Sequence, residues 1–194
     1  FIISIIDFGS SKIFNSSFIR DTGIPIEIKP EIFNYCPKEQ KIILGQIENY
    51  VNSNNPNNKS KFSKFIKFLQ KNNNKFNLVI DGANIGFFNQ GKNSGKILNL
   101  KQIIDFVKIF KMKNYKPLLI LHTKYTKQDP EFTDIIKKEC LVYFTPHSMD
   151  DDWFWLYASI KQKNCFILTN DNMRNHIFYM ALTHSFTEWK QYRI

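Results

Sequence analysis

Residues 76–86 read FNLVIDGANIG, and this stretch decides the fold. The run from Phe76 to Ile80 predicts a buried strand that ends at Asp81, where small residues let backbone and solvent approach the carboxylate. Three more short apolar runs follow, each with a helical pattern of apolar residues behind it. Strands are expected at 76–80, 117–121, 141–144 and 165–168, and helices at 103–110, 132–138, 153–161 and 173–182. This alternation predicts an α/β fold, a parallel sheet with helices on both faces.

The carboxyl ends of these strands carry the residues that matter most, because ligands of parallel sheets bind there. In this sequence the four ends carry Asp81, His122, segment 146–152 and segment 169–171. Strands that neighbour one another would bring four acids to one edge of the sheet: Asp81, Asp151, Asp152 and Asp171.

Such a cluster of acids calls for a cation. Two carboxylates 4 Å apart repel by about 4 kcal/mol at an effective dielectric constant near 20. Oxygen ligands favour Mg²⁺ or Mn²⁺ over Zn²⁺, and a bound ion could activate a water against a phosphodiester. Taken singly, each acid is explained equally well as a turn or helix-capping residue. Acids at three strand ends together favour the metal centre.

Composition limits the class of protein. The chain has 194 residues, of which 43% are hydrophobic and 15% aromatic, which excludes a disordered or collagen-like chain. The formal net charge of +10 makes a polyanion the first partner to consider, with solubility as the alternative reason for the charge. No apolar run approaches the roughly 20 residues of a membrane span, so no membrane partner is expected. The three cysteines show no CxxC spacing, and we expect reduced thiols.

The chain divides into three segments by composition. Residues 1–50 hold strand-like pieces at 1–6 and 25–28 and a helical pattern at 38–51, which indicates a small N-terminal α+β module. Residues 51–75 are rich in Lys and Asn, contain no acid, and predict a connector with a short basic amphipathic helix. Residues 76–194 form the α/β domain. A second group of lysines after the first α/β strand suits an RNA backbone or a solvated face: Lys92, Lys96, Lys101, Lys108, Lys111, Lys113 and Lys116.

Three strings around the acids are specific. They read DGAN at 81–84, DDWFWLYA at 151–158 and TNDNMRNHIF at 169–178. In this order they resemble the metallonuclease domain of protein-only RNase P, an NYN-type member of the PIN-like nucleases, from residue 76 to the end of the chain. The resemblance implies a PIN-like parallel sheet and makes Asp81, Asp151, Asp152 and Asp171 the carboxylates of a centre that holds two Mg²⁺ ions, which Mn²⁺ can replace.

The activity that the resemblance implies is ribonuclease P. This endoribonuclease removes the 5′ leader of precursor tRNA by attack of a metal-activated water, and leaves a 5′ phosphate on the tRNA. Five further residues are expected to support the metal or contact the substrate: Asn84, Asp150, Asn175, Arg174 and His122. Asp150 adjoins the acid pair, so a register shifted by one residue is the alternative.

The sequence also departs from the family pattern. Asn172 and Asn175 stand where the family has acids, and an amide keeps the shape but brings no charge. The zinc module of the family has cysteines where this chain has Ile19 and Thr22, and Arg193 stands where a histidine is expected, so zinc is not expected. Cys36 is expected to be a buried thiol.

Two other functions stay open at this point. One is an NYN-type nuclease that cleaves a different structured RNA, and the other is a tRNA-binding module without catalysis. Precursor tRNA is the expected partner, and the residues name no protein partner. An organelle, mitochondrion or plastid, is the expected compartment, with the nucleus as the alternative.

Overall fold

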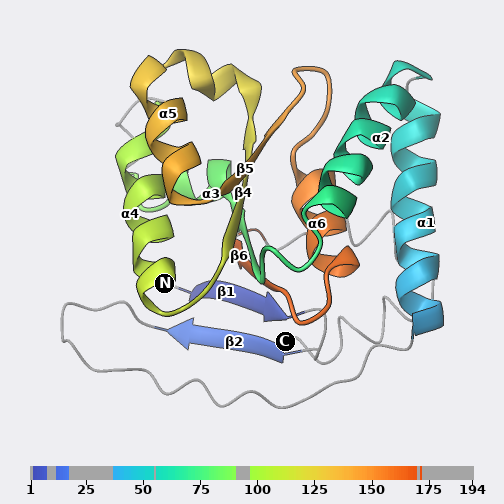
Figure 1. Ribbon diagram of the computed structural model, residues 1–194, viewed down its shortest axis with the longest axis horizontal. Helices are drawn as coiled ribbons and strands as arrows, with labels where there is room; N and C mark the ends of the chain where they lie inside the picture. Colours follow the sequence, from blue (N-terminus) through green and yellow to red (C-terminus); the bar gives the residue numbers. More distant parts are fainter. Residues whose placement is uncertain are drawn as a thin grey trace.

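The computed structural model describes residues 2–7, 12–17, 37–54, 56–90, 97–169 and 171, and of the first two ranges only the backbone. Its centre is one six-stranded sheet with the order β2-β1-β6-β3-β4-β5 (Figure 1). The strands are β1 (Ile2–Asp7), β2 (Lys12–Ser17), β3 (Leu78–Asp81), β4 (Pro117–His122), β5 (Leu141–Thr145) and β6 (Phe166–Thr169). The strand expected at 25–28 and the helix expected at 173–182 lie outside the described residues.

The four α/β strands are parallel, as the alternation of strands and helices predicted. β3 pairs with β4 on one side and with β6 on the other, and β4 pairs with β5. Every residue of β3 and β4 is buried, since helices cover both faces of a parallel sheet. β1 extends the sheet beyond β6 in antiparallel orientation, and β2 pairs antiparallel with β1.

Two layers of helices cover the sheet (Figure 1). On one face lie α3 (Gly82–Phe87), α4 (Leu100–Met112) and α5 (Pro130–Glu139), which pack on Leu78, Ile80 and Leu119. On the other lie α1 (Pro37–Asn54), α2 (Pro56–Lys71) and α6 (Asp152–Lys161), which pack on Val79 and Ile167. The alternation of odd and even strand residues between the two cores follows from the two-residue period of a strand.

Helix α6 lies inside the molecule. All residues from Trp153 to Ile160 are buried, so the helix is apolar around its whole circumference, with Ser159 bonding back to the Leu156 carbonyl. The helix that the sequence predicted at 153–161 is present as α6.

Helix α2 belongs to the same core. Phe62 meets Phe154 and Tyr157 edge-on at 5.2 Å, and Phe65 lies 4.9 Å from Phe154 between ring centroids. α1 ends at Asn54 and α2 begins at Pro56, so the basic helix expected inside a connector is a 16-residue helix joined closely to α1. The division into segments 1–50, 51–75 and 76–194 stays a prediction. Its middle segment is here a packed element.

The turns that return the chain to the sheet use asparagine. Asn74 before β3, Asn114 before β4 and Asn164 before β6 have positive φ angles of 61°, 64° and 51°. Asparagine tolerates this left-handed conformation better than other residues with a Cβ. None of the helices in the described residues is long and apolar enough to cross a membrane.

Candidate active site

The polar ends of the four parallel strands lie side by side. β3 ends at Asp81, β4 at His122, β5 at Thr145 and β6 at Thr169, and all four residues are buried. Their neighbourhood follows from the strand order β6-β3-β4-β5. The strand-end residues that the sequence singled out therefore lie at one edge of the sheet.

Asp81 stands at the centre of this edge and is only 2% exposed. Its Oδ1 accepts a hydrogen bond from the backbone N–H of Asn84 at 3.1 Å and so caps α3. Burial, followed by the charges of Asp152 and Asp151, raises the pKa of Asp81 well above its usual value. Capping and membership of an acid cluster, which the sequence left as alternatives, occur together in this residue.

Gly82 allows α3 to begin directly at the strand end. A Cβ at this position would lie 2.9 Å from the carbonyl oxygen of Ile120 and 2.9 Å from Cδ1 of Leu119 on the neighbouring strand. A larger residue would therefore push α3 away from β4 and move Asp81 with it.

Thr169 links two of the acids. Its hydroxyl donates a hydrogen bond to Oδ2 of Asp81 at 2.9 Å and accepts one from the backbone N–H of Asp171 at 3.1 Å. Both carboxylate oxygens of Asp81 are thus held in place, and the chain is turned so that Asp171 follows at the strand end. Sequence reasoning noted Thr169 only as a strand-end residue. A hydroxyl residue at the carboxyl end of a predicted parallel strand could have indicated that Thr169 contacts the acids.

The Asp150–Asp152 run enters α6 from the β5 side. Oδ1 of Asp150 accepts from the backbone N–H of Asp152 at 3.2 Å, a turn contact just before α6, whereas the N-cap residue Asp151 makes no side-chain capping bond. Oδ1 of Asp152 accepts from Nε1 of Trp155 at 3.0 Å, which orients the carboxylate from inside the helix. This contact between Trp155 and Asp152 was not predicted from the sequence. One carboxylate oxygen from each of the three acids lies within 4.8 Å of the others.

Burial and neighbouring carboxylates disfavour the ionised form of three acids at the site, Asp81, Asp151 and Asp152. Burial, then Asp150 and further acids including Asp171, raise the pKa of Asp152 to about 7. The pKa of Asp151 is also raised, mainly by burial, and within the part of the chain that the structure describes its buried Oδ2 has no hydrogen-bond partner. A buried carboxylate oxygen with no donor is costly unless a cation or proton occupies it. The all-oxygen donor set and this orphaned oxygen fit a divalent cation such as Mg²⁺.

His122 lies beside the acids on β4. Its Nδ1 accepts from the backbone N–H of Lys124 at 3.0 Å, and its ring meets that of His147 at 5.3 Å between centroids. Burial and the Lys124 charge lower the pKa of His122, which favours a neutral imidazole, while the charge of Asp151 acts in the opposite direction.

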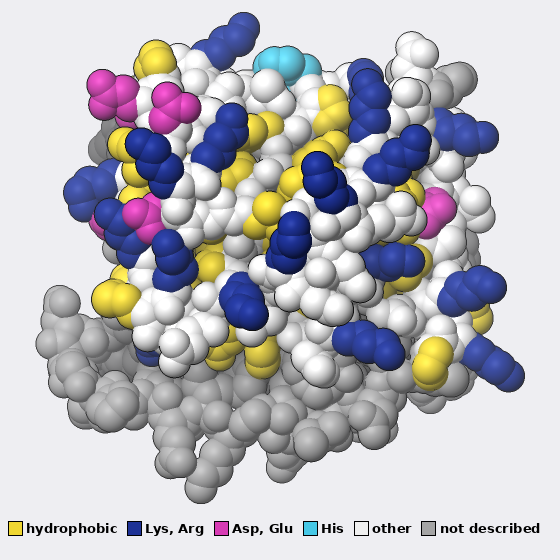
Figure 2. All heavy atoms as spheres, in the orientation of Figure 1, with side chains coloured by type: hydrophobic (Ala, Val, Ile, Leu, Met, Phe, Trp, Pro, Cys, Tyr) yellow, Lys and Arg dark blue, Asp and Glu magenta, His cyan; other side chains and the backbone are white. Residues whose placement is uncertain are grey.

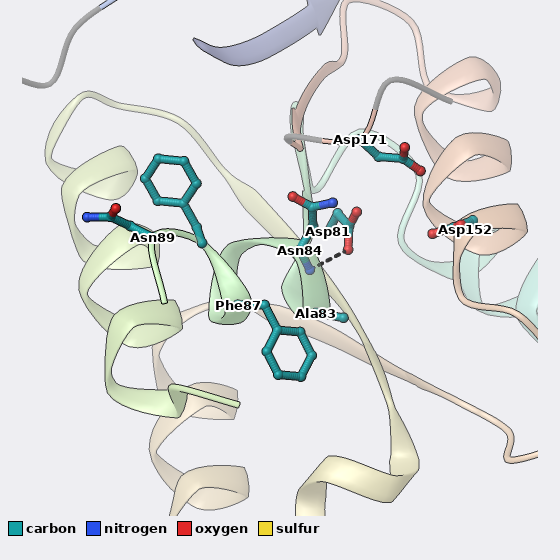
Figure 3. A pocket seen from close by; sticks show the side chains of 8 residues that line it. Asp81, Ala83, Asn84, Phe87, Asn89, Asp152 and Asp171 are labelled. Atoms are coloured by element: carbon teal, nitrogen blue, oxygen red, sulfur yellow. Dashed lines mark hydrogen bonds between the residues drawn. The ribbon is translucent and has the colours of Figure 1, made fainter. Parts of the chain in front are cut away.

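A cavity of about 390 Å³ opens at the acids. Figure 3 shows the carboxylates of Asp81, Asp152 and Asp171 around one space, with Asn84 beside Asp81. The remaining lining residues are Ala83, Phe87, Phe88 and Asn89. Of the expected supporting residues, Asn84, Asp150 and His122 lie at this edge, and Arg174 and Asn175 fall outside the described residues.

Comparisons with known proteins agree with this architecture. A family model described as protein-only RNase P matches residues 24–193 of the chain. Proteinaceous RNase P 3 and proteinaceous RNase P 2 of Arabidopsis thaliana are each 34% identical over 125 residues, which is 60% of this chain and 21% and 23% of those proteins.

Two solved structures of nuclear proteinaceous RNase P 2 from Arabidopsis thaliana share the fold, with TM-scores of 0.65 and 0.66 at 28% and 29% identity. They cover 80% and 81% of this chain and 32% and 34% of their own chains. The chain thus spans just over a fifth of the length of the curated relatives it matches. With the family model matching most of its residues, the chain belongs to the protein-only RNase P family.

Proposed function

We propose that the chain is the catalytic part of a Mg²⁺-dependent endoribonuclease that removes the 5′ leader of precursor tRNA. The observation that carries the proposal is the meeting of Asp81, Asp152 and Asp171, from three strand ends, at one cavity. Asp151 does not line this cavity but adjoins Asp152, and its buried Oδ2 has no donor among the described residues. The named relatives are RNase P proteins, which supports tRNA processing as the reaction. The orphaned oxygen supports a metal ion.

Asp81, Asp151, Asp152 and Asp171 would hold the ion or ions. When bound, Mg²⁺ lowers the pKa of a water and neutralises charge on the scissile phosphate, and a second ion would stabilise the leaving oxygen. The four acids offer oxygen ligands alone, which suits Mg²⁺ or Mn²⁺ better than zinc.

The protein's own contribution is to hold these carboxylates before the ion arrives. Thr169 fixes Asp81, Trp155 fixes Asp152, and Asp150 accepts from the backbone N–H of Asp152 in the turn that enters the helix. The raised pKa values at the site mean that part of the cluster binds protons in the absence of metal, so metal binding releases protons. We therefore expect Mg²⁺ affinity to rise as the pH rises through about 7.

The test is leader cleavage by the Asp151→Asn variant on a 5′-labelled precursor tRNA. The amide keeps the shape but removes the charge, so cleavage should fall by a factor of about 100 or more, while tRNA binding remains. Asp134→Asn on the exposed side of α5 is the matched control and should cleave as the unchanged protein does. Full activity of Asp151→Asn would refute the assignment of this residue.

The same assay separates the related alternatives. Cleavage of unrelated RNA hairpins at rates equal to those on precursor tRNA would indicate a nuclease with a different substrate. Absence of turnover at every Mg²⁺ and Mn²⁺ concentration, with tRNA still bound, would indicate a binding module.

A further inference from the structure

We propose that the lysine stripe of α2, made of Lys61, Lys64, Lys67 and Lys71, is a docking surface for the RNA phosphate backbone beside the metal site. The inference rests on the proposed function and deepens it by naming the surface that carries the substrate. It assigns binding to a helix that the sequence pattern placed in a connector.

The stripe is a consequence of helical spacing. The four lysines are separated by three, three and four residues, so they share one side of the helix over about 15 Å. Phe62, Phe65 and Leu69 occupy the opposite side and are buried. Lys64, Lys67 and Lys71 are exposed, and Lys61 is partly so. α2 is therefore anchored on one side by the core and presents the lysines, with Ser60, Ser63 and Gln70 beside them, on the other.

The stripe begins at the active site. Nζ of Lys61 donates a hydrogen bond to Oγ of Ser148 at 2.6 Å. Ser148 lies in the connection between β5 and α6, two residues before Asp150. From there α2 runs back toward the start of β3, so its lysines lead away from the acids along one side of the molecule. An RNA strand whose scissile phosphate sits at the acids can continue along this side.

The charge of the stripe is not neutralised by neighbouring acids. The ion pairs within the described part of the chain are Lys101–Asp105 and Lys111–Glu139, neither of which involves α2. Segment 51–75 contains no acid at all. Figure 2 shows Lys and Arg side chains across this whole face, and most of the acidic side chains lie over the half that α4 and α5 occupy in Figure 1. The half that α1 and α2 occupy is basic with little acidic surface.

The chemistry of α2 favours RNA over a lipid surface. A helix that binds membranes must insert its apolar side into the lipid. Here that side is occupied by α6, with Phe62 and Phe65 buried against Phe154. A row of lysine charges suits a phosphate backbone, and such contacts position the substrate without reading its sequence.

The experiment compares two triple variants of the 194-residue chain that lose the same charge. The test variant is Lys64→Gln, Lys67→Gln, Lys71→Gln. The control is Lys108→Gln, Lys113→Gln, Lys116→Gln, in which two of the three lysines precede β4 and so lie at the sheet edge opposite the acids. Precursor tRNA binding is measured against salt concentration, with Asp151→Asn added to all proteins to prevent cleavage.

Each lysine that neutralises a phosphate contributes about 0.7–0.9 to the slope of log K against log salt. We expect the slope of the α2 variant to fall by about 2 to 3 and that of the control by less than 1. In the cleavage-competent background, the α2 variant should lose rate at low enzyme concentration and regain it at saturation. The circular dichroism spectrum of the variant checks that α2 remains helical.

Equal slopes for the two triple variants would overturn the inference, since net charge alone would then explain binding. It would also be overturned if the α2 variant kept its RNA slope but lost binding to phosphatidylserine vesicles. Failure of the unchanged chain to cleave precursor tRNA would instead count against the proposed function. The binding comparison is read independently of that result.

Discussion

Replacing Asp152 by Asn should make the metal-free protein more stable at neutral and alkaline pH. The carboxylate of Asp152 is desolvated and faces Asp150, Asp151 and Asp171, and these surroundings raise its pKa from 3.8 to about 7. Between those two pH values the folded protein binds more protons at this site than the unfolded chain does. Stability therefore falls as the pH rises from 4 to 7, and the loss is complete above 7.

The size of the effect follows from the pKa. A rise from 3.8 to about 7 corresponds to at most about 4 kcal/mol at pH 8, because each tenfold change in proton affinity is worth about 1.4 kcal/mol. Solvent screening of this partly exposed group reduces the figure, and we expect Asp152→Asn to gain about 1–3 kcal/mol. Its Oδ1 still accepts from Nε1 of Trp155, so the contact that orients the side chain is kept.

Urea unfolding in EDTA at pH 8 and again at pH 5 measures the gain. The advantage of Asp152→Asn should shrink at pH 5, where the wild-type carboxyl is protonated in the folded state. Asp134→Asn on the exposed side of α5 is the control and should change the free energy of unfolding by less than about 0.5 kcal/mol. Added Mg²⁺ should stabilise the unchanged protein more than the Asp152 variant. A lower free energy of unfolding in Asp152→Asn than in the unchanged protein, at pH 8 without metal, would refute the view that the ionised Asp152 carboxylate destabilises the folded protein.

Three other substitutions test contacts that hold the site and the core beneath it. Thr169→Val removes the hydroxyl that holds Asp81 and should slow single-turnover leader cleavage about tenfold or more, whereas Thr169→Ser should restore most of the rate; an unchanged rate in Thr169→Val would contradict the positioning role. Tyr157→Phe removes the 2.6 Å hydrogen bond to Oε1 of Glu48 and should lower the free energy of unfolding by about 1–2 kcal/mol in urea titration. Gly82→Ala inserts a Cβ where backbone lies 2.9 Å away and should cost about 1–3 kcal/mol, measured as a lower thermal midpoint; a midpoint equal to that of the unchanged chain would show that α3 can shift freely.

The α/β class, the parallel order of the elements and the sheet edge at which the acids lie could be predicted from local sequence patterns. These features are readable because hydrophobic periodicity is local, and because parallel strands present their carboxyl ends at one edge whatever the packing of the rest. The family was likewise readable from DGAN, DDWFWLYA and TNDNMRNHIF, since each string keeps its residue types in a fixed local order.

The hydrogen bonds that hold the acids, and the size of the increase in their pKa values, depend on the tertiary structure. The hydroxyl of Thr169 reaches Asp81 across 88 residues of sequence, and the Lys61–Ser148 contact spans 87. No local pattern encodes contacts of such separation. The sequence likewise predicted α2 as a basic helix within a connector. The packing of its apolar side against α6 is visible only in the folded structure. The raised pKa values and the orphaned Asp151 oxygen arise from burial and from charges brought together in space, which no spacing along the chain can report.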